Sequence, residues 1–497
     1  MFYALPLSSS TFATNHSSRR HWRKKSCQFR ILLSASAPSP QHGENEDCIN
    51  KEGQGLSSVV LIERYSNGST KRYVFDKQSR VQTFLEKHAS ETDKLRFPYS
   101  ANFVTQLPDF LKDFILPAGF PVSVSDDYLE YMLWQFPTNV TAWICYTLVT
   151  SSLLKAVGVG SLPATAAAAS AAAIRWVSKD GIGAIGRLII GGRFGNLFDD
   201  DPKCYRMYAD FIGSAGSIFD LSTQLYPTFF LPLASLGNLS KAVARGLKDP
   251  SVRVIQNHFA VSGNLGDVAA KEEVWEVSAQ LVGLAFGVLI LDTPSLTSYP
   301  VLVLTWMSMR LFHLWLRYQS LSVLQFKTIN FKRACVLAKF HVSHSMVPGL
   351  IHCNREENIL SWQRFLKPRI IFGVSLEEII AVEKSLSMVK TILKLYAKEK
   401  FVLLVNSWQE KAFEVSVCFK RGATSLSALR SIWQAYWLYE NRMSENMNAL
   451  LEQSLLKLDD GFDNFIQQLN DAGWETHEIT LKVPKEPLIE ELDPVFD

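Results

Sequence analysis

KDGIGAIGRLIIGGRFGNLFDDDPKCYRMYADFIGSAGSIFD, from Lys179 to Asp220, is the stretch of this chain that decides its fold. Glycines, charged residues and apolar residues alternate in it too closely for a solvated surface. Gly191 and Gly195 have the small-xxx-small spacing that lets two helix backbones approach each other. We therefore expect a helical region that packs through its glycines.

The same stretch contains a match to the GxGxxG pattern at Gly181, Gly183 and Gly186. That pattern binds a pyrophosphate only where a strand precedes the glycines and a helix follows them. Here the preceding run, TAAAASAAAIRWVSK at 165–179, is rich in alanine and favours a helix. Close helix packing is therefore the preferred interpretation, and nucleotide binding is the alternative.

Charged residues flank the glycines. A helix is expected to begin at Asp201-Pro202, a capping acid followed by proline at the first helical position, which places Arg206 and Asp210 one turn apart. Charges that face a protein or membrane interior are costly unless paired, and such groups often mark a ligand or ion path. The alternative is a structural network that holds helices together. The candidate buried charge network comprises Lys179, Asp180, Arg206, Asp210 and Asp220.

No metal centre or catalytic residue is predicted. The run Asp199–Asp201 offers oxygen ligands, but no EF-hand spacing or second acidic cluster accompanies it. His341, His344, His352 and Cys353 fit no standard zinc spacing. The chain also lacks the GxSxG, P-loop, HExxH and kinase signatures.

Size and composition indicate two or three domains with a sizeable core, since the chain has 497 residues and 47% of them are hydrophobic. The mean hydropathy of +0.04 is high for a soluble protein, so membrane contact has to be considered. Seven cysteines are scattered without a CxxC pair, which favours reduced thiols over a disulfide framework.

The first 43 residues contain six basic residues and no acidic one. This composition, together with many serines, is typical of an organelle transit peptide, and a disordered basic tail is the alternative. Without those six, the chain keeps 45 of its 51 basic residues against 48 acidic ones. Nucleic acid is therefore not an expected partner, because the body lacks a basic field.

Three uncharged or nearly uncharged stretches are candidates for contact with lipid: Val157–Ile174, Leu221–Ser240 and Val277–Met309. Prolines interrupt the second, and each half of the third is shorter than the roughly 20 apolar residues of a spanning helix. Spanning helices, a re-entrant hairpin and buried core helices all remain open. Three such stretches together favour membrane association. The basic residues expected at a headgroup surface, or at the solvated end of an amphipathic helix, are Arg310, His313, Arg317 and Lys327.

The remaining pattern predicts five regions. These are a transit peptide or disordered leader at 1–45, a hairpin region at 46–96 around Asn67-Gly68, a helical domain at 97–345, a linker at 346–374 and an α/β domain at 375–497. The expected fold is thus mainly α: a glycine-rich, membrane-associated helical domain followed by a smaller α/β domain.

Local signals set the expected elements inside these regions. Ser125 is expected to cap one helix, and the helix after Asp201 should carry an apolar stripe. Ser375 and Glu378 fit a capping box that opens the C-terminal domain. Strands are expected at 401–405, 412–419 and 474–482, and helices from Ser425 and over 443–470, the latter with a break at Gly461. The stripe comprises Met207, Phe211, Ile218, Leu221 and Leu225.

Three quoted segments resemble the plant Root UV-B Sensitive family: the opening stretch, PAGFPVSVSDDYLEYMLWQ at Pro117–Gln135 and GNLGDVAAKEE at Gly263–Glu273. The resemblance covers roughly residues 97–345. It implies roles in seedling growth, UV-B responses, vitamin B6 homeostasis and auxin-related development. It also implies a plastid location and complexes with a paralogous member, and it supplies no established catalytic mechanism.

Two functional hypotheses follow from this resemblance and the apolar stretches. The first is a non-enzymatic, membrane-associated plastid protein that serves as a binding, transport-like or scaffold component. The alternative is a protein or enzyme that binds pyridoxal phosphate, for which a lysine would have to form the Schiff base. The lysines considered in the family-like region are Lys179, Lys203, Lys241 and Lys271, and none lies in a recognisable cofactor motif.

Overall fold

The computed structural model describes most of the chain from residue 58 onward. The described ranges are 58–64, 69–75, 81–87, 107–157, 200–294, 298–360, 367–375, 377–378, 386–407, 413–442 and 447–490, with single positions and short runs between 170 and 192. Lys179, Gly183, Gly191 and Gly195 lie outside the described residues.

The N-terminal region forms a small sheet in the order β1-β2-β3. The predicted hairpin corresponds to β1 and β2, which are neighbours in this sheet. The third strand was not predicted; it pairs antiparallel with β2. The strand bounds are β1 Ser58–Arg64, β2 Ser69–Phe75 and β3 Val81–Lys87.

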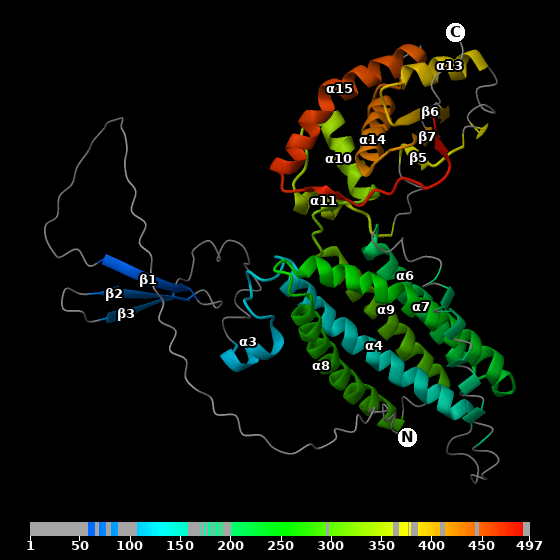
Figure 1. The fold of residues 1–497 in the computed structure, drawn as a ribbon. Coiled ribbons are helices and arrows are strands. Elements are labelled where there is room, and N and C mark those ends of the chain that lie inside the picture. The colour runs from blue at the N-terminus through cyan, green and yellow to red at the C-terminus, as the bar shows by residue number, and fades with distance from the viewer. Residues whose placement is uncertain are drawn as a thin grey trace, which may run out of the picture. The chain divides into compact units, whose positions relative to one another are not determined.

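The central region is a bundle of long helices (Figure 1). Helix α6 packs against α7, and α4 packs against α8 and α9. A short helix, α3, precedes the bundle and contacts α8. The bounds are α3 Asp109–Ile115, α4 Tyr128–Val157, α6 Pro202–Ser222, the 3-10 turn η2 Pro227–Phe229, α7 Phe230–Phe259, α8 Leu265–Asp292 and α9 Tyr299–Ser322.

Glycines set how closely these helices approach. A Cβ atom at Gly216 of α6 would lie 2.7 Å from the carbonyl oxygen of Gly237 in α7. On α8, a Cβ at Gly283 would lie 2.6 Å from the carbonyl oxygen of Val140 in α4. Carbon atoms do not approach oxygen this closely, so only glycine allows these two contacts. The expected packing through glycines is therefore confirmed, at Gly216 within the opening stretch and at Gly283 outside it.

The start of α6 is confirmed, and the start of α4 differs from its prediction. The Asp201 carboxylate accepts a hydrogen bond from the Cys204 amide at 3.1 Å, and Pro202 is the first residue of α6. Helix α4 begins at Tyr128, three residues after Ser125. Ser125 does not cap it in the expected way, because its hydroxyl donates to the Asp127 carboxylate at 2.6 Å.

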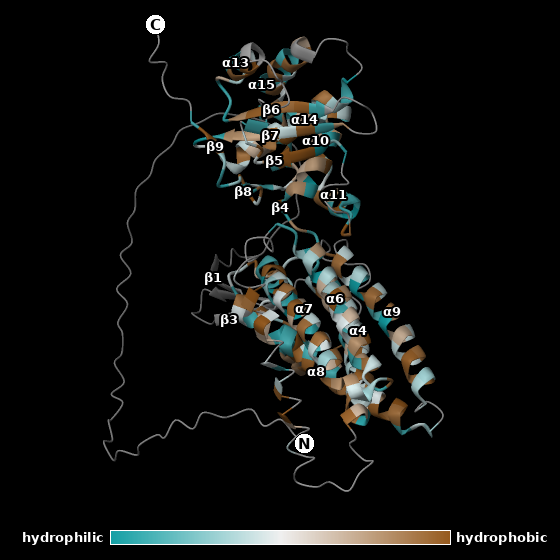
Figure 2. Ribbon diagram, turned by 90° about the vertical axis from the view of Figure 1, so that its right-hand side faces the viewer, coloured by the Kyte–Doolittle hydropathy of each residue, from teal (hydrophilic) through white to brown (hydrophobic). Residues whose placement is uncertain are grey.

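The apolar stripe predicted for α6 is wrong as a single buried face. Met207 and Leu221 are buried, whereas Phe211, Ile218 and Leu225 are 39%, 54% and 55% exposed. The reason is that α6 packs on α7 through small residues. Its buried face therefore carries small and charged side chains, and several large apolar ones are exposed. Figure 2 shows the hydropathy of each residue along the helices of the bundle.

Within the part of the chain that the structure describes, two helices, α4 and α8, are long and apolar enough to cross a membrane. Of the predicted stretches, Val277–Met309 is shared between the end of α8 and the start of α9. Leu221–Ser240 is not one helix, because Pro227 begins the turn between α6 and α7. Val157–Ile174 lies mostly outside the described residues. Helix α4 was expected as a helix but was not among the stretches predicted to contact lipid, because Pro137 and its polar neighbours interrupt the apolar pattern.

The C-terminal region is an α/β unit. In its sheet, β7 lies between β5 and β6, parallel to the first and antiparallel to the second, and β9 adds to β7 in parallel. A separate parallel pair joins β4 to β8. The bounds are β4 Thr328–Ile329, α10 Phe331–His344, α11 Leu350–Glu356, β5 Arg369–Phe372, α13 Leu386–Leu395, β6 Phe401–Ser407, β7 Glu414–Lys420, α14 Ser425–Glu440, α15 Met447–Asp471, β8 Glu475–Ile479 and β9 Leu488–Ile489.

Most C-terminal predictions are confirmed, including the strands β6, β7 and β8 and the helix from Ser425. The Ser375 hydroxyl accepts from the Glu378 amide at 3.2 Å, as a capping box requires. The break at Gly461 is wrong: α15 continues through it, because residues on either side are buried in the core and Gly461 faces Trp433. That core also includes Phe331 and Leu337, so α10 packs with the C-terminal elements.

Candidate functional site

The first candidate site is a buried cluster of charges centred on Asp210 of α6. The Asp210 Oδ2 atom lies 2.7 Å from Arg317 Nε, 3.1 Å from Arg206 Nη1 and 3.4 Å from His313 Nε2. Arg310 Nη2 is 3.9 Å from Asp210 Oδ1. Three of these partners come from α9, which brings them to α6 across the bundle. We call Arg206, Asp210, Arg310, His313 and Arg317 the arginine cluster.

Neighbouring polar groups hold part of the arginine cluster in place. Arg317 donates to the side-chain oxygen of Gln135 on α4. Arg310 donates to the Ser214 hydroxyl at 2.5 Å and to the Asp210 carbonyl oxygen at 2.7 Å. His313 Nδ1 lies 3.0 Å from the carbonyl oxygen of Thr138. These contacts fix Arg310, His313 and Arg317 from several directions.

Arg206 is held less completely. Its side chain is 2% exposed, yet its Nε has no hydrogen-bond partner among the described residues. The same holds for the hydroxyl of Tyr131, which is fully buried on α4 and on which Arg206 and Arg317 act electrostatically. Buried donors without acceptors are rare, because each costs roughly 1–3 kcal/mol. The arginine cluster therefore retains unused hydrogen-bonding capacity next to an excess of positive charge.

The structure brings together only two of the five residues of the candidate charge network. Arg206 and Asp210 form an ion pair. Asp220 is buried elsewhere on α6 and pairs with Lys241 of α7 at 2.5 Å. Asp180 is exposed and accepts from Asn238 at 3.3 Å. Lys179 lies outside the described residues. Whether these residues mark a ligand path stays a prediction.

Most of the basic residues expected at a headgroup surface lie inside the bundle instead. His313 and Arg317 are each 1% exposed and face the interior of the bundle, whereas only Lys327 is exposed. The physical reason is Asp210, whose carboxylate on α6 compensates the buried cations. Their spacing was a usable signal, because Arg310, His313 and Arg317 recur at the 3–4 residue interval of one helix face.

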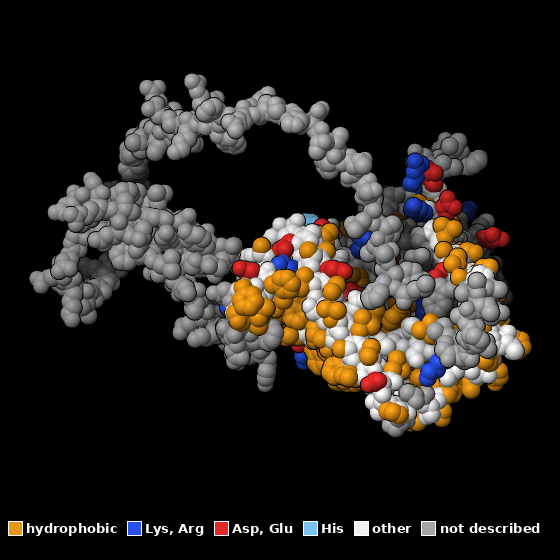
Figure 3. Space-filling model, turned by 90° about the horizontal axis from the view of Figure 1, so that it is seen from below, with side chains coloured by type: hydrophobic (Ala, Val, Ile, Leu, Met, Phe, Trp, Pro, Cys, Tyr) orange, Lys and Arg blue, Asp and Glu red, His pale blue; other side chains and the backbone are white. Residues whose placement is uncertain are grey.

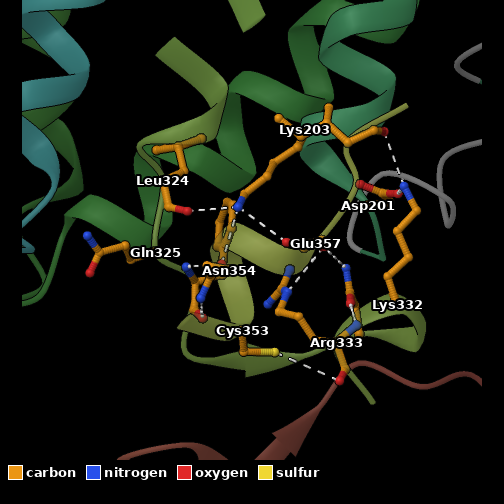
Figure 4. A network of polar contacts seen from close by, with 12 residues as sticks. Asp201, Lys203, Leu324, Gln325, Lys332, Arg333, Cys353, Asn354 and Glu357 are labelled. Carbon is orange, nitrogen blue, oxygen red and sulfur yellow. Dashed lines mark hydrogen bonds and ion pairs between the residues drawn. The ribbon is translucent and has the colours of Figure 1, made fainter. Parts of the chain in front are cut away.

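A second buried network centres on Glu357, directly after α11 (Figure 4). Its Oε2 lies 3.2 Å from Lys203 Nζ, and its Oε1 lies 3.3 Å from Arg333 Nε and accepts from Asn330 Nδ2 at 3.0 Å. Next to it, Lys332 Nζ lies 2.7 Å from the capping carboxylate of Asp201. We call these residues the Glu357 network. It joins the first turn of α6 to α10 and α11.

The donors of the Glu357 network are occupied, although its three cations exceed its two carboxylates. Burial alone would raise the pKa of Glu357, but Arg333 and Lys203 outweigh it and lower the pKa to about 2. Lys203 also donates to the Leu324 carbonyl oxygen at 2.7 Å and to the side chain of Asn354 at 3.2 Å. Such a network favours a structural role, since its donors are occupied.

The lysines considered for a Schiff base do not offer a prepared amine. Lys203 is engaged by three acceptors in the Glu357 network. Lys241 pairs with Asp220, and Lys271 donates to the carbonyl oxygens of Asp113 and Phe114. An imine requires a neutral amine that can reach an aldehyde. The three described lysines therefore do not fit this role as placed.

The residues weighed as zinc ligands are used in packing. His341 Nδ1 accepts from Trp433 Nε1 at 3.0 Å, and His352 stacks edge-on against Phe340. Cys353 is buried. Within the described part of the chain, no group of three or more His, Cys, Asp or Glu side chains is placed to hold a metal ion.

Comparison with known proteins finds matches along most of the chain. Residues 103–345 match the family described as "Vitamin B6 photo-protection and homoeostasis domain", and residues 347–485 match "Root UVB sensitive protein, C-terminal". Among the relatives, "Protein root UVB sensitive 5" of Arabidopsis thaliana is 59% identical over 93% of both chains. "RUS family member 1" of Dictyostelium discoideum is 31% identical over 59% of this chain and 55% of its own. "Protein root UVB sensitive 2, chloroplastic" of Arabidopsis thaliana is 27% identical over 74% of this chain and 82% of its own. No solved structure matches the chain significantly.

Proposed function

Because this chain belongs to the Root UV-B Sensitive family, we propose that it is a non-enzymatic, membrane-associated plastid protein that serves as a binding, transport-like or scaffold component. Its context is plant development and the UV-B response. The description of the domain at residues 103–345 supports a further link to vitamin B6 homeostasis.

The observation that carries membrane association is the arrangement of side chains on α8. Toward the protein this helix places the small residues Ala279, Gly283 and Gly287. Outward it places large apolar side chains, with Leu281 65% and Leu289 62% exposed. A soluble helix does the reverse, whereas membrane helices pack through small residues and present large ones to lipid.

Other helices of the bundle also expose large apolar side chains. On α9, Leu304 and Leu311 are 61% and 64% exposed, and Ile218 of α6 is exposed as well. Apolar side chains gather on the end of the molecule that Figure 3 shows. Exposed apolar surface on several helices of one bundle exceeds what a soluble monomer commonly leaves to water, which supports contact with lipid. The exposed apolar side chains support membrane association in addition to the mean hydropathy.

Fractionation tests this proposal directly. Plastids that contain the full chain are lysed and separated into soluble and membrane fractions, and the membranes are washed with high salt and with alkaline carbonate. We expect the protein to stay in the membrane fraction until detergent is added. Full recovery in the soluble fraction without detergent would exclude membrane association.

A variant with a matched control ties the result to α8. Replacing Leu281, Phe286 and Leu289 together by Gln should move a large share of the protein to the carbonate-soluble fraction, because polar side chains are costly in hydrocarbon. Leu456→Gln is the control, since Leu456 is equally exposed but lies on α15 of the C-terminal unit. An equal shift for both would mean that general misfolding, and not lipid contact, causes it.

The plastid location rests on the acid-free leader and on one relative that is named chloroplastic. A fluorescent protein fused behind residues 1–45 should enter plastids and lose the leader. A matched fusion in which Arg19, Arg20 and Arg23 are replaced by Glu should remain outside, since import machinery selects against negative charge. Cytosolic retention of the first fusion would contradict this location.

For a partner, we propose a paralogous family member. The exposed apolar side chains of the bundle, which need not all face lipid, support such a contact. Co-purification from mild detergent with tagged paralogues tests it, and the absence of every paralogue from the purified material would contradict it.

An absorbance band at about 400 nm that disappears on borohydride treatment would instead support the alternative function, a protein or enzyme that binds pyridoxal phosphate.

A further inference from the structure

The arginine cluster holds more positive than negative charge. Three guanidinium groups face the single carboxylate of Asp210, and Arg206 and Arg317 are at most 2% exposed. Glu272 of α8 also acts electrostatically on this region, and its carboxylate is held by Gln256 at 2.7 Å. With Glu272 included, three cations still face two anions. The Glu357 network has the same balance, with Lys203, Lys332 and Arg333 against Asp201 and Glu357, but its donors are occupied. The unused donors, and not the charge excess, therefore distinguish the arginine cluster.

We propose that the arginine cluster is a binding site for a small oxyanion that carries a phosphate or carboxylate group. Arg206 supplies the unused N–H group, and the Tyr131 hydroxyl supplies a second donor without a partner among the described residues. A planar guanidinium binds tetrahedral and carboxylate oxyanions through paired hydrogen bonds, which an ammonium cannot do. Arg310 and Arg317 add charge without leaving their present partners.

Asp210 has a defined role in this proposal. Its carboxylate contacts Arg206, Arg317 and Arg310, so it holds three cations together that would otherwise repel one another. It also lowers the charge of the site, so that bound anion is released instead of trapped. A binding or transport-like component needs such reversible binding, and this inference rests on that proposed role.

Phosphate binding to the purified full chain tests the site. Inorganic phosphate is titrated against the protein in a non-ionic detergent at constant ionic strength, with chloride as the reference anion. Calorimetry and the unfolding temperature are both recorded. We expect saturable binding of phosphate and a rise in unfolding temperature that chloride does not produce. Phosphatidic acid in mixed micelles forms a second arm, which distinguishes a lipid headgroup from a free anion as the source.

Two variants make the result specific. Arg206→Gln should weaken phosphate binding about tenfold or more, the loss expected for charge-assisted hydrogen bonds. Its unfolding temperature in chloride should change little, because Asp210 keeps Arg317 and Arg310 as partners and the unpartnered Nε donor is removed. Arg253→Gln is the control, since Arg253 is exposed on α7 and its loss should leave phosphate binding unchanged.

Opposite outcomes overturn the proposal. If phosphate and chloride act alike on the parent chain, or if Arg253→Gln loses as much binding as Arg206→Gln, the cluster is structural only. Should Arg206→Gln fail to fold, Tyr131→Phe removes the other unused donor with little change in shape, and unchanged phosphate affinity there excludes the site. Fractionation is independent of these measurements, so membrane association and anion binding fail separately.

Discussion

Glu357 shows at the scale of single residues how this chain tolerates buried charge. It lies 3.2 Å from Lys203 and 3.3 Å from Arg333, and all three side chains are 1% exposed. Bringing these charges out of water is costly, and only their mutual attraction and additional hydrogen bonds compensate for it. Removing one partner therefore costs more than the interaction itself contributes.

Glu357→Gln is expected to lower the free energy of unfolding by about 3–5 kcal/mol, because it leaves two cations without their shared carboxylate. Chemical denaturation of the purified chain measures the change. Glu490→Gln is the control: its partner Arg421 is exposed, so the loss should stay within about 0.5 kcal/mol. Similar losses for both variants would contradict a special role for the Glu357 network.

Acid should act through the same carboxylate. The pKa of Glu357 is lowered from its ordinary value of 4.5 to about 2, so the folded state favours the ionised form. This contribution to stability is present above pH 4.5 and is lost as the pH falls toward 2. The stability difference between the parent chain and Glu357→Gln should therefore narrow over this range. A difference that stays constant between pH 5 and pH 2.5 would show that Glu357 is not the titrating group.

At the scale of elements, the contact between α4 and α8 depends on a glycine surface. Gly283 and Gly287 place α8 directly against the backbone and side chains of α4, where a Cβ atom would be 2.6–2.8 Å from its neighbours. Gly266 lies on the same helix, but nothing lies within 4 Å of its Cβ position. Close packing of α8 on α4 therefore requires glycine at position 283, whereas position 266 has room for a larger residue.

Alanine substitutions separate these roles. Gly283→Ala should lower stability by about 1–3 kcal/mol, because the added methyl group forces α8 away from α4. Gly266→Ala should raise stability by about 0.4–1 kcal/mol, because alanine reduces the entropy of the unfolded chain where its Cβ meets no obstacle. Thermal unfolding of the solubilised protein compares them. Equal changes for the two variants would mean that α8 does not pack through Gly283.

At the scale of the whole molecule, the bundle and the C-terminal unit differ in how many large apolar side chains they expose. Exposed apolar side chains recur on α6, α8 and α9, whereas the C-terminal unit buries most of its apolar residues around the β5-β7-β6 sheet. Five described cysteines are all buried, so they give little background in a labelling experiment. With Cys27 and Cys48, which lie outside the described residues, replaced by Ser, single new cysteines can report which surface meets water.

Leu289→Cys on α8 and Leu456→Cys on α15 form a matched pair, with 62% and 63% exposure of the native side chains. In open membrane fragments, a charged maleimide should label the α15 position and leave the α8 position largely unmodified, since lipid excludes both water and the charged reagent. Detergent with a small permeant maleimide should then label both. Rapid labelling of Leu289→Cys in intact bilayers would contradict lipid contact.

Much of this architecture was readable from local patterns. Asp201-Pro202 fixed the start of α6, the Ser375 and Glu378 pair marked a capping box, and short apolar runs indicated β6 and β7. These signals involve residues within a few positions of one another, so the chain itself carries them. The family followed in the same way from three quoted segments.

The sequence by itself therefore determined the fold class, the glycine-mediated helix packing and most of the C-terminal elements, because these depend on short-range geometry. Only the tertiary structure decided that Arg310 and Arg317 face Asp210 across the bundle, and that α8 turns its glycines inward. Charge pairing between residues about 100 positions apart has no local pattern, since it depends on which helix faces which. The direction of a uniformly apolar helix is equally undetermined until its neighbours are in place.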